Sequence, residues 1–411
     1  MRGFLVTQLK EECFGCESCV QSCPINIIHM EKDDEGFDYP KIKLEECTHC
    51  NNCHNSCPFE FPVEKSDEKQ TAFGGYVTNS KIRSESTSGG AFSAIVENWC
   101  DENYAIFGAT ADGLNVYHTF ITDKNNISLF RKSKYIQSTI GSSYADVRNF
   151  LIKGKKVIFS GTPCQIAGLK AYLNPLEFDN LLTIEVICEG VPSPLFMKRY
   201  NEYFENKNGS KISSLDYRFK DMKSFDNNGK GKWDFQVMLI TLEDGTEKKI
   251  DRWINPFWDI WLNHLMSRPS CYKCPFTTKE RVADITLGDL WGVHLYCPEL
   301  YGDNAGASLI ICNTQNGKKV LDMSKHDFYG HDLDINEAIK YQSPMRKPID
   351  YNNDRVEFME DIKIMDYEEL CKKWYNKPSI KLLFSKYIWG NRQKIHLWNL
   401  KNKFKKMFSI F

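Results

Sequence analysis

Short apolar runs alternate with amphipathic stretches along the chain from about residue 74 to about residue 341. The clearest case is an apolar run at 157–160, a helical pattern over 165–173 and a second apolar run at 183–187. A strand, a helix and a strand in this order predict a βαβ unit, whose parallel strands end at the same edge of a sheet. We therefore expect an α/β body that binds its ligands at that edge.

Two further segments of this body have a pattern that suits a charged ligand. Residues 84–100 join a loop of small residues to an apolar helical pattern, which places Ser88, Gly89 and Gly90 at a helix N-terminus. Free N–H groups and the helix dipole favour a phosphate there, although an ordinary helix cap explains the same residues equally well. The second segment, 131–138, groups cations with polar side chains, which alone is typical of a solvated surface. Its members are Arg131, Lys132, Lys134, Tyr135, Gln137 and Ser138.

The N-terminal segment is dominated by two cysteine runs, CFGCESCVQSCP and CTHCNNCHNSCP. Both follow the spacing C-x2-C-x2-C-x3-C-P of two-cluster bacterial ferredoxins, in which the fourth cysteine ligates the other cluster. The first cluster is therefore assigned to Cys13, Cys16, Cys19 and Cys57. The second is assigned to Cys47, Cys50, Cys53 and Cys23.

Other features of the N-terminal segment agree with this α+β ferredoxin prediction. A pair of zinc knuckles is the alternative, and the doubled run with its two prolines disfavours it. Residues 35–40, EGFDYP, suit a small β-hairpin, and the polar segment 63–70 suits a linker.

Four more cysteines are candidate ligands of a further metal site. Cys164 follows the first strand of the βαβ unit and Cys188 follows the second. Cys271 and Cys274 form a C-x2-C pair before an apolar run that ends in a Gly-Asp turn. Four thiolates are the number that a 4Fe–4S cluster requires. A zinc site and unrelated buried cysteines are the alternatives, and Cys297 is a reserve ligand.

The composition is that of a globular protein: 411 residues, 42% hydrophobic and 26% charged. A formal net charge of −1 gives no overall attraction to nucleic acid, so nucleic acid is not an expected partner. The N-terminal MRGFLVTQLKEEC lacks the apolar core of a secretory signal, and no apolar run is long enough to span a membrane. We therefore expect a cytoplasmic location, where sixteen cysteines indicate metal ligands or catalysis in place of disulfides.

The C-terminal segment 377–411 has a different pattern, with nine Lys or Arg, no Asp or Glu, and interleaved Leu, Trp and Phe. A basic amphipathic segment of this kind suits the surface of an anionic membrane. An acidic surface of the protein itself is an equally good partner. Peripheral membrane contact would suit an enzyme that acts on a lipid-linked substrate.

Taken in order, six motifs resemble the beta-subunit family of coenzyme F420 hydrogenases and dehydrogenases. The motifs are SxSGGxFS, SKYxQS, GTPCQIAGL, CxGVPSP, CxxCPF and ADITLGDLWG. The ferredoxin module in front resembles that of the input subunit of the dehydrogenase for reduced F420, and the family also includes 7-hydroxymethyl chlorophyll a reductase. We expect a ferredoxin-type domain at 1–66, an FAD- and iron–sulfur-binding body at 67–345 and a C-terminal extension at 346–411.

The resemblance implies a flavoprotein body, and it carries roles onto matching residues. The residues expected to contact FAD are Ser88, Gly89, Gly90, Lys134, Tyr135, Gln137, Ser138, Gly161, Thr162, Pro163 and Gln165. The expected ligands of a third 4Fe–4S cluster are Cys164, Cys188, Cys271 and Cys274. Two positions depart from the family pattern: Glu189 replaces the usual His, and Lys132 replaces a common Gly. Both bear on the identity of the hydride partner.

We therefore expect an iron–sulfur flavoprotein oxidoreductase. A ferredoxin or another redox partner exchanges electrons with the clusters, and FAD exchanges a hydride with an organic substrate or with coenzyme F420. The alternatives are an electron-input subunit of a larger complex that oxidises reduced F420, a reductase of an envelope-polysaccharide or lipid-linked intermediate, and a plain electron carrier. Asp289, in the Gly-Asp turn, is the candidate catalytic residue, and turn formation is its other explanation.

Overall fold

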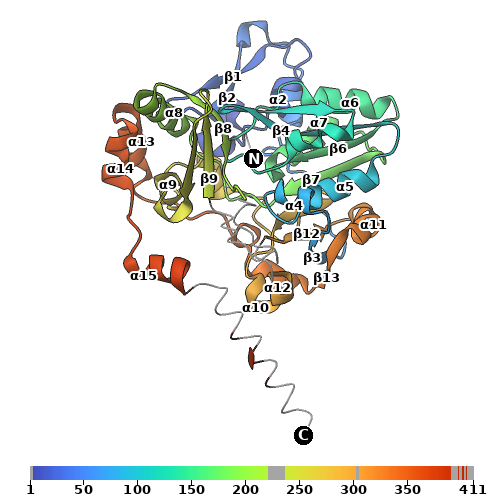
Figure 1. The fold of residues 1–411 in the computed structure, drawn as a ribbon. Helices are drawn as coiled ribbons and strands as arrows, with labels where there is room; N and C mark the ends of the chain where they lie inside the picture. The colour runs from blue at the N-terminus through green and yellow to red at the C-terminus, as the bar shows by residue number, and fades with distance from the viewer. Residues whose placement is uncertain are drawn as a thin grey trace.

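A computed structural model describes residues 3–220, 237–301 and 305–389, together with residues 397, 400, 401 and 404. Eight strands form a mixed sheet at the centre of the body (Figure 1). They are β3 (Thr71–Val77), β4 (Tyr104–Asp112), β5 (Asn115–Ile121), β6 (Lys156–Gly161), β7 (Leu181–Val186), β11 (Ile285–Asp289), β12 (Ser308–Cys312) and β13 (Phe328–Leu333). The strand order is β13-β3-β12-β11-β7-β6-β4-β5. The strands β11, β7, β6 and β4 run parallel, and antiparallel strands flank them on both sides.

The predicted βαβ unit is present as β6, helix α7 (Pro163–Leu173) and β7. The two strands are parallel, with Ser160 opposite Ile184. The helix begins at Pro163 and not at the predicted Gln165, because proline fits the first turn and Thr162 forms a capping box with Gln165. The structure thus confirms the α/β prediction and places the carboxyl ends of β6 and β7 at one edge of the sheet.

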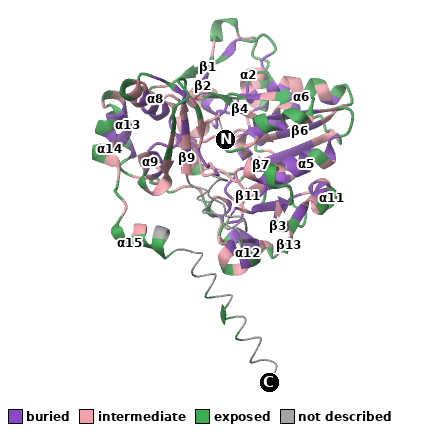
Figure 2. Ribbon diagram, in the orientation of Figure 1, coloured by how far each residue is buried: buried purple, intermediate pink, exposed green. Residues whose placement is uncertain are grey.

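Helices cover both faces of this sheet, as a sheet with parallel central strands requires. On one face, α5 (Ala91–Trp99) and α11 (Gln315–Ser324) enclose an apolar core that includes Ile95 and Ile158. On the other face, α6 (Ser143–Ile152) and α7 enclose a core that includes Val147 and Phe159. Figure 2 shows the central strands β6 and β7 largely buried between these layers.

The N-terminal segment is built from short helices and one hairpin. The elements are α1 (Phe4–Thr7), α2 (Ser18–Gln21), β1 (Ile28–Lys32), β2 (Asp38–Ile42) and α3 (Asn52–Asn55). Strands β1 and β2 pair antiparallel, which confirms the hairpin expected around residues 35–40. Phe14 of this segment packs against Phe276 in the core beneath α6 and α7, with 5.3 Å between ring centroids. The ferredoxin-like segment therefore lies on that face of the body.

A second apolar core lies beside the large sheet. Its walls are a three-stranded sheet, β8 (Ile212–Asp216), β9 (Val237–Leu242) and β10 (Glu247–Asp251), and the helices α8 (Pro194–Asn208), α9 (Pro256–Leu262), α13 (Arg355–Ile364) and α14 (Tyr367–Trp374). Phe358 and Tyr367 pack there against Phe196. Helices from the predicted C-terminal extension thus contribute to this core. The domain boundaries at 66 and 345 stay predictions.

The remaining helices are α4 (Ser80–Ser84), α10 (Val293–Tyr296), α12 (Ile335–Lys340) and α15 (Ile380–Leu383). No helix in the described part of the chain is both long and apolar enough to cross a membrane. The predicted basic segment 377–411 is described continuously only as far as residue 389. Beyond that residue, the amphipathic pattern lies mainly outside the described residues.

Candidate functional site

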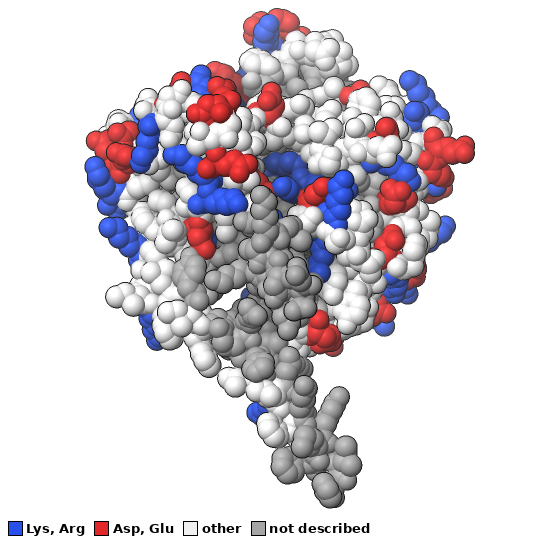
Figure 3. Space-filling view, viewed as in Figure 1, with Lys and Arg blue, Asp and Glu red and all other residues white. Residues whose placement is uncertain are grey.

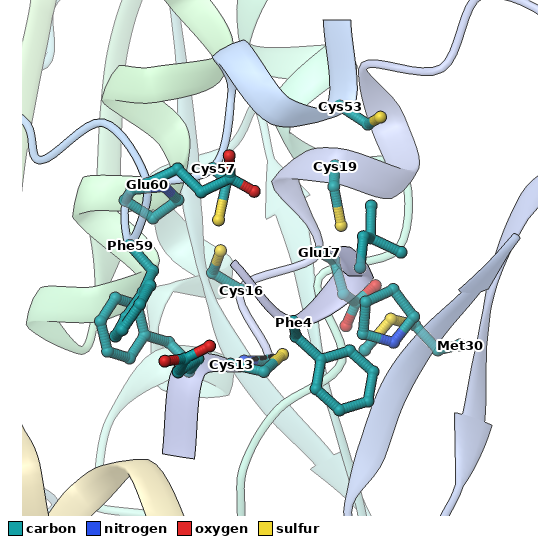
Figure 4. Close-up of a pocket in the computed structure, with 16 residues that line it drawn as sticks. Phe4, Cys13, Cys16, Glu17, Cys19, Met30, Cys53, Cys57, Phe59 and Glu60 are labelled. Atoms are coloured by element: carbon teal, nitrogen blue, oxygen red, sulfur yellow. Dashed lines mark hydrogen bonds between the residues drawn. The ribbon is translucent and has the colours of Figure 1, made fainter. Parts of the chain in front are cut away.

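The first predicted cluster site gathers its four cysteines around one pocket. Cys13, Cys16, Cys19 and Cys57 line this pocket, and Figure 4 shows their sulfur atoms pointing into the space between them. Cys53, from the second set, also lines the pocket, but its sulfur points away from that space in Figure 4. Burial raises the pKa of Cys16 and Cys19 well above the usual range, and neighbouring thiolates of the same set raise it further. A positively charged iron core would relieve this repulsion.

The second predicted set lies closer to the surface. Cys23 is buried and packs with Cys47 and Cys53. Cys50 is exposed. Burial raises the pKa of Cys53, with smaller contributions from the thiolates of Cys23 and Cys50. The chain thus brings Cys57 to the first cysteine run and Cys23 to the second, which is the crossed grouping that the sequence predicts.

A third set lies at the carboxyl ends of the parallel strands. Cys164 follows β6, Cys188 follows β7, and both line a cavity of about 670 Å³ together with Cys271 and Cys274. Burial raises the pKa of Cys188 well above its usual range, and the thiolates of Cys271 and Cys164 raise it further. Burial also raises the pKa of Cys271 to about 11 and that of Cys274 to about 12. Burial raises the pKa of Cys164 as well, so these four thiols become thiolates readily only when a metal centre binds them.

The spacing of these thiols bears on which metal centre they fit. In a zinc tetrathiolate with Zn–S bonds near 2.3 Å, the sulfur atoms lie about 3.8 Å apart. Among the described residues, three ligand atoms lie within 4.8 Å of one another only at Cys297, Glu299 and His331. No three sulfurs of the predicted cluster sets are that close, so their spacing is wider than zinc needs.

The same cavity collects the residues expected to contact FAD. All of them except Gly89 line it, and its volume falls within the range of about 300–1,000 Å³ typical of ligand pockets. Gly89 lies just outside, with its N–H donating to the hydroxyl of Ser308 at 2.9 Å. Ser88 and Gly90 precede α5, with Gly90 as the N-cap in a left-handed conformation (φ 91°).

Cations surround this cavity. The cavity-lining basic residues include Arg131, Lys132, Lys134, Arg218 and Arg252. In Figure 3, Lys and Arg side chains lie deep in the hollow at the centre of the face. The ammonium of Lys134 donates to the carbonyls of Leu129 and Arg131, and burial lowers its pKa to about 8. The concentration of positive charge suits a phosphorylated ligand.

Behind the GTPCQ turn lies a buried hydrogen-bond network that the sequence did not reveal. Gln165 is 2% exposed, and its amide donates to the hydroxyl of Ser138 at 2.9 Å. That hydroxyl lies 2.9 Å from Nδ1 of His118, whose Nε2 lies 3.0 Å from the carbonyl oxygen of Ser160. The carbonyl accepts, so Nε2 carries the proton and Nδ1 accepts from Ser138. The hydrogen bonds of Ser138 and Gln165 therefore hold the GTPCQ turn in place. The neutral His118 ring links Ser138 to the carbonyl of Ser160.

This network predicts a dependence of stability on pH. Burial lowers the pKa of His118 to about 4, whereas an unfolded histidine has a pKa of about 6.5. Between these values the unfolded chain binds a proton that the folded chain excludes, so the free energy of unfolding falls as the pH is lowered. The difference is about 2 kcal/mol between pH 7 and pH 5. Urea unfolding at both pH values should show a smaller fall for His118→Gln, and equal falls would contradict the prediction.

Asp289 lines the cavity, and its hydrogen-bond and ion-pair partners indicate a structural role. One carboxylate oxygen is in an ion pair with Arg218. The backbone carbonyl of Asp289 accepts from the amide of Gln342 at 2.7 Å. The other carboxylate oxygen, Oδ1, is buried with no hydrogen-bond partner among the described residues. Asp289 therefore orients Arg218 and leaves one acceptor available for a bound group.

Arg268, which the sequence analysis did not single out, connects the first cysteine set to the cavity. It is 1% exposed and lines the cavity. Its guanidinium donates to the carbonyls of Cys13 and Asp38 at 3.0 and 2.9 Å, and to the side-chain oxygen of Gln137 at 3.0 Å. Gln137 in turn donates to the carbonyl of Phe14 at 2.9 Å. A single Arg three residues before a C-x2-C pair carries no sequence signal for this role.

Glycine at position 168 allows the first cysteine set to approach the third. A Cβ atom there would lie 2.9 Å from Cβ of Cys16 and 3.1 Å from its sulfur. Gly168 lies on α7, the helix whose first turn carries Cys164. Glu17 and Gln21 add to the contact, because their side chains accept from backbone N–H groups at 140–141 and 144–145, next to the start of α6.

The two departures from the family pattern have different consequences. Lys132 has a φ of 68°, a left-handed conformation that favours glycine, which accounts for the glycine common at this position in the family. Its ammonium is in an ion pair with Asp216, which offsets some of the strain. Glu189 lines the cavity, where burial raises its pKa and the charge of Arg252 opposes the shift.

Comparison with known proteins adds two family matches. Residues 12–61 match the 4Fe-4S dicluster domain, and residues 154–331 match the C terminus of the coenzyme F420 hydrogenase/dehydrogenase beta subunit. Among solved structures, the chain is similar to one in the xenon-derivatized F420-reducing NiFe hydrogenase complex from Methanosarcina barkeri. That match has 17% identity and a TM-score of 0.42, and it covers 77% of this chain and 97% of the other. No curated protein matches. This chain, with its 4Fe–4S dicluster domain, is therefore an iron–sulfur oxidoreductase related to the coenzyme F420 hydrogenase/dehydrogenase beta subunit.

Proposed function

We propose that this protein conducts electrons from two ferredoxin-type clusters through a third 4Fe–4S cluster to FAD, which exchanges a hydride with an organic substrate or with coenzyme F420. One observation carries the proposal: the four body cysteines and the residues expected to contact FAD line the same cavity. Bound FAD supplies the conversion between single electrons and a hydride equivalent.

The residues at the cavity fit a dinucleotide of this kind. The Gly161–Gln165 turn lies at the carboxyl end of β6, where its backbone can approach a ligand closely. Arg131 and Lys134 would neutralise the pyrophosphate. Oδ1 of Asp289, which has no hydrogen-bond partner among the described residues, would accept a hydrogen bond from a donor on the bound ligand.

The positions of the cysteine sets give the proposed path an order. Cys16 of the first set packs on α7, next to the helix turn that carries Cys164. The second set is at the surface, where Cys50 and residues 48–52 are exposed. A ferredoxin or another redox partner would therefore exchange electrons with the second cluster, and the first cluster would pass them to the third.

Anaerobic purification followed by iron, sulfide and flavin quantitation tests this proposal. Three 4Fe–4S clusters give about twelve irons per chain, together with one FAD. About eight irons with zinc in place of the rest, or a chain that binds no flavin when FAD is added, would overturn the proposed path.

A second measurement separates the two classes of organic partner. The holoprotein is mixed anaerobically with reduced coenzyme F420, and the absorbance of the clusters and of FAD is followed. Bleaching of both supports F420 as the hydride partner. If only reduced ferredoxin bleaches the flavin, the partner is a different organic acceptor.

A further inference from the structure

Outside the cavity, three potential metal ligands meet at one edge of the large sheet. They are Cys297, directly after α10, Glu299 in the following 3-10 turn (Pro298–Tyr301), and His331 on strand β13. The sulfur of Cys297 lies 3.1 Å from Nε2 of His331 and 3.3 Å from Oε1 of Glu299. Nε2 and Oε1 are 3.0 Å apart. Cys297 is buried, and the other two side chains are about half exposed.

The contact of the second ring nitrogen of His331 shows which of the two nitrogens carries a proton. Nδ1 lies 3.1 Å from the carbonyl oxygen of Asp332. A carbonyl can only accept, so Nδ1 carries a proton. In a neutral imidazole, Nε2 then has a lone pair, and this lone pair faces a carboxylate oxygen and a sulfur. Three electron-rich atoms this close need a proton or a metal ion between them. The proton can be that of the Cys297 thiol, whose sulfur donates to Oε1 of Glu299, or a second proton on His331.

We propose that Cys297, Glu299 and His331 bind a zinc ion. Sulfur, imidazole nitrogen and carboxylate oxygen are all ligands that zinc uses, and its bonds of about 2.0–2.3 Å place tetrahedral ligand atoms about 3.3–3.6 Å apart. The observed separations of 3.0, 3.1 and 3.3 Å are shorter by a few tenths of an ångström. The exposed side chains of Glu299 and His331 can make that adjustment.

The surroundings of His331 agree with a ligand role. Metal-bound histidines usually donate their other N–H to a carbonyl or carboxylate, which fixes the ring and the tautomer. The Nδ1 contact with the carbonyl of Asp332 is such a bond. Three protein ligands leave a fourth position for water at the exposed side of the site.

The proposed ion would connect two segments that border the redox cavity. Cys297 and Glu299 follow Asp289, the last residue of β11, and Trp291, and both of these residues line the cavity. Tyr296, next to Cys297, stacks on the cavity residue Tyr341 with 5.4 Å between ring centroids. The ion would fix this segment to β13, which is an edge strand. We therefore assign the site a structural task that is separate from electron transfer.

The test uses the full chain, purified anaerobically with its clusters loaded, so that cluster cysteines do not take up zinc. Zinc bound after equilibration with free zinc is measured against a competing chelator in the wild type and in His331→Gln. His326→Gln is the control, because His326 is an exposed histidine close by and lies outside the group of three. We expect one tight zinc per chain in the wild type and the control, and at least a tenfold loss of zinc affinity in His331→Gln.

Glu299→Gln provides a second variant, which keeps the shape of the side chain and removes its charge. Iron content and circular dichroism verify that each variant is folded. Loss of tight zinc in both variants with iron unchanged supports the site. The proposal is overturned if the wild type binds no zinc, or if both variants bind it as tightly as His326→Gln does. The three side chains would then be held together by protons, on the Cys297 thiol or on His331. Neither result depends on whether FAD binds, so the test is independent of the proposed function.

Discussion

Replacing Cys164 by Ser should leave the two ferredoxin-type clusters in place and abolish electron transfer from them to the flavin. Cys164 lines the cavity with Cys188, Cys271 and Cys274, and its helix contacts Cys16 of the first set. Serine is a poor ligand for a cluster iron, so the chain should lose one cluster, or about four irons. Stopped-flow mixing with a reduced ferredoxin would show the N-terminal clusters reduced and the flavin still oxidised.

Cys371→Ser is the matched control for this experiment. Cys371 is also partly buried, but it packs in the second apolar core, away from all three cysteine sets. Its replacement should leave iron content and flavin reduction unchanged. Full flavin reduction by ferredoxin in Cys164→Ser, with only eight irons per chain, would contradict the proposed path. It would mean that electrons reach the flavin directly from the first cluster.

The sequence predicted the elements that carry local signals. The C-x2-C-x2-C-x3-C-P runs identify the cluster-binding segments from a few neighbouring residues alone, because three ligands of one cluster require that spacing. The βαβ unit was predictable because its apolar runs and its capping turn lie within 35 residues of one another in sequence. The meeting of Cys164 and Cys188 followed from this unit, since parallel neighbouring strands end at one edge.

Features that depend on long-range packing were not predictable in this way. Arg268 contacts Cys13 across 255 positions of the chain, and nothing near Arg268 in sequence indicates that contact. His118 appeared to be one of nine scattered histidines, and only the fold places it behind the GTPCQ turn. The C-terminal helices α13 and α14 have apolar faces, but which core they complete depends on the second sheet.

Gln137 shows how one residue can serve two neighbours. The family resemblance assigns it to FAD contact, and it does line the cavity. Its amide nitrogen, however, donates to the carbonyls of Phe14 and Gly15 in the first cysteine run. Its oxygen accepts from Arg268. Gln137 therefore lies between the ferredoxin-like segment and the cavity. The family resemblance treats these two parts as separate domains, so it could not predict this position.

Replacing Arg268 by Met should weaken this junction and lower the reduction potential of the first cluster. The guanidinium bonds three buried acceptors, and each acceptor left without a donor costs about 1–3 kcal/mol. One of its nitrogens also lies 3.6 Å from the sulfur of Cys13. A nearby positive charge and an N–H···S contact both favour the reduced, more negative cluster, so their removal shifts the potential to more negative values.

Arg268→Lys separates the two effects, because lysine keeps the charge but not the planar fork that reaches several acceptors at once. The Arg268→Lys variant should keep a reduction potential close to that of the wild type but lose most of the stability that Arg268 contributes. The Arg268→Met variant should show both a more negative potential and lower stability. Arg148→Met, at an exposed position on α6, is the control and should change neither. Redox titration followed by electron paramagnetic resonance reports the potential, and anaerobic urea unfolding reports the stability. If Arg268→Met leaves the potential of the first cluster unchanged while the protein stays folded, Arg268 supports the junction mechanically and has no part in tuning electron flow.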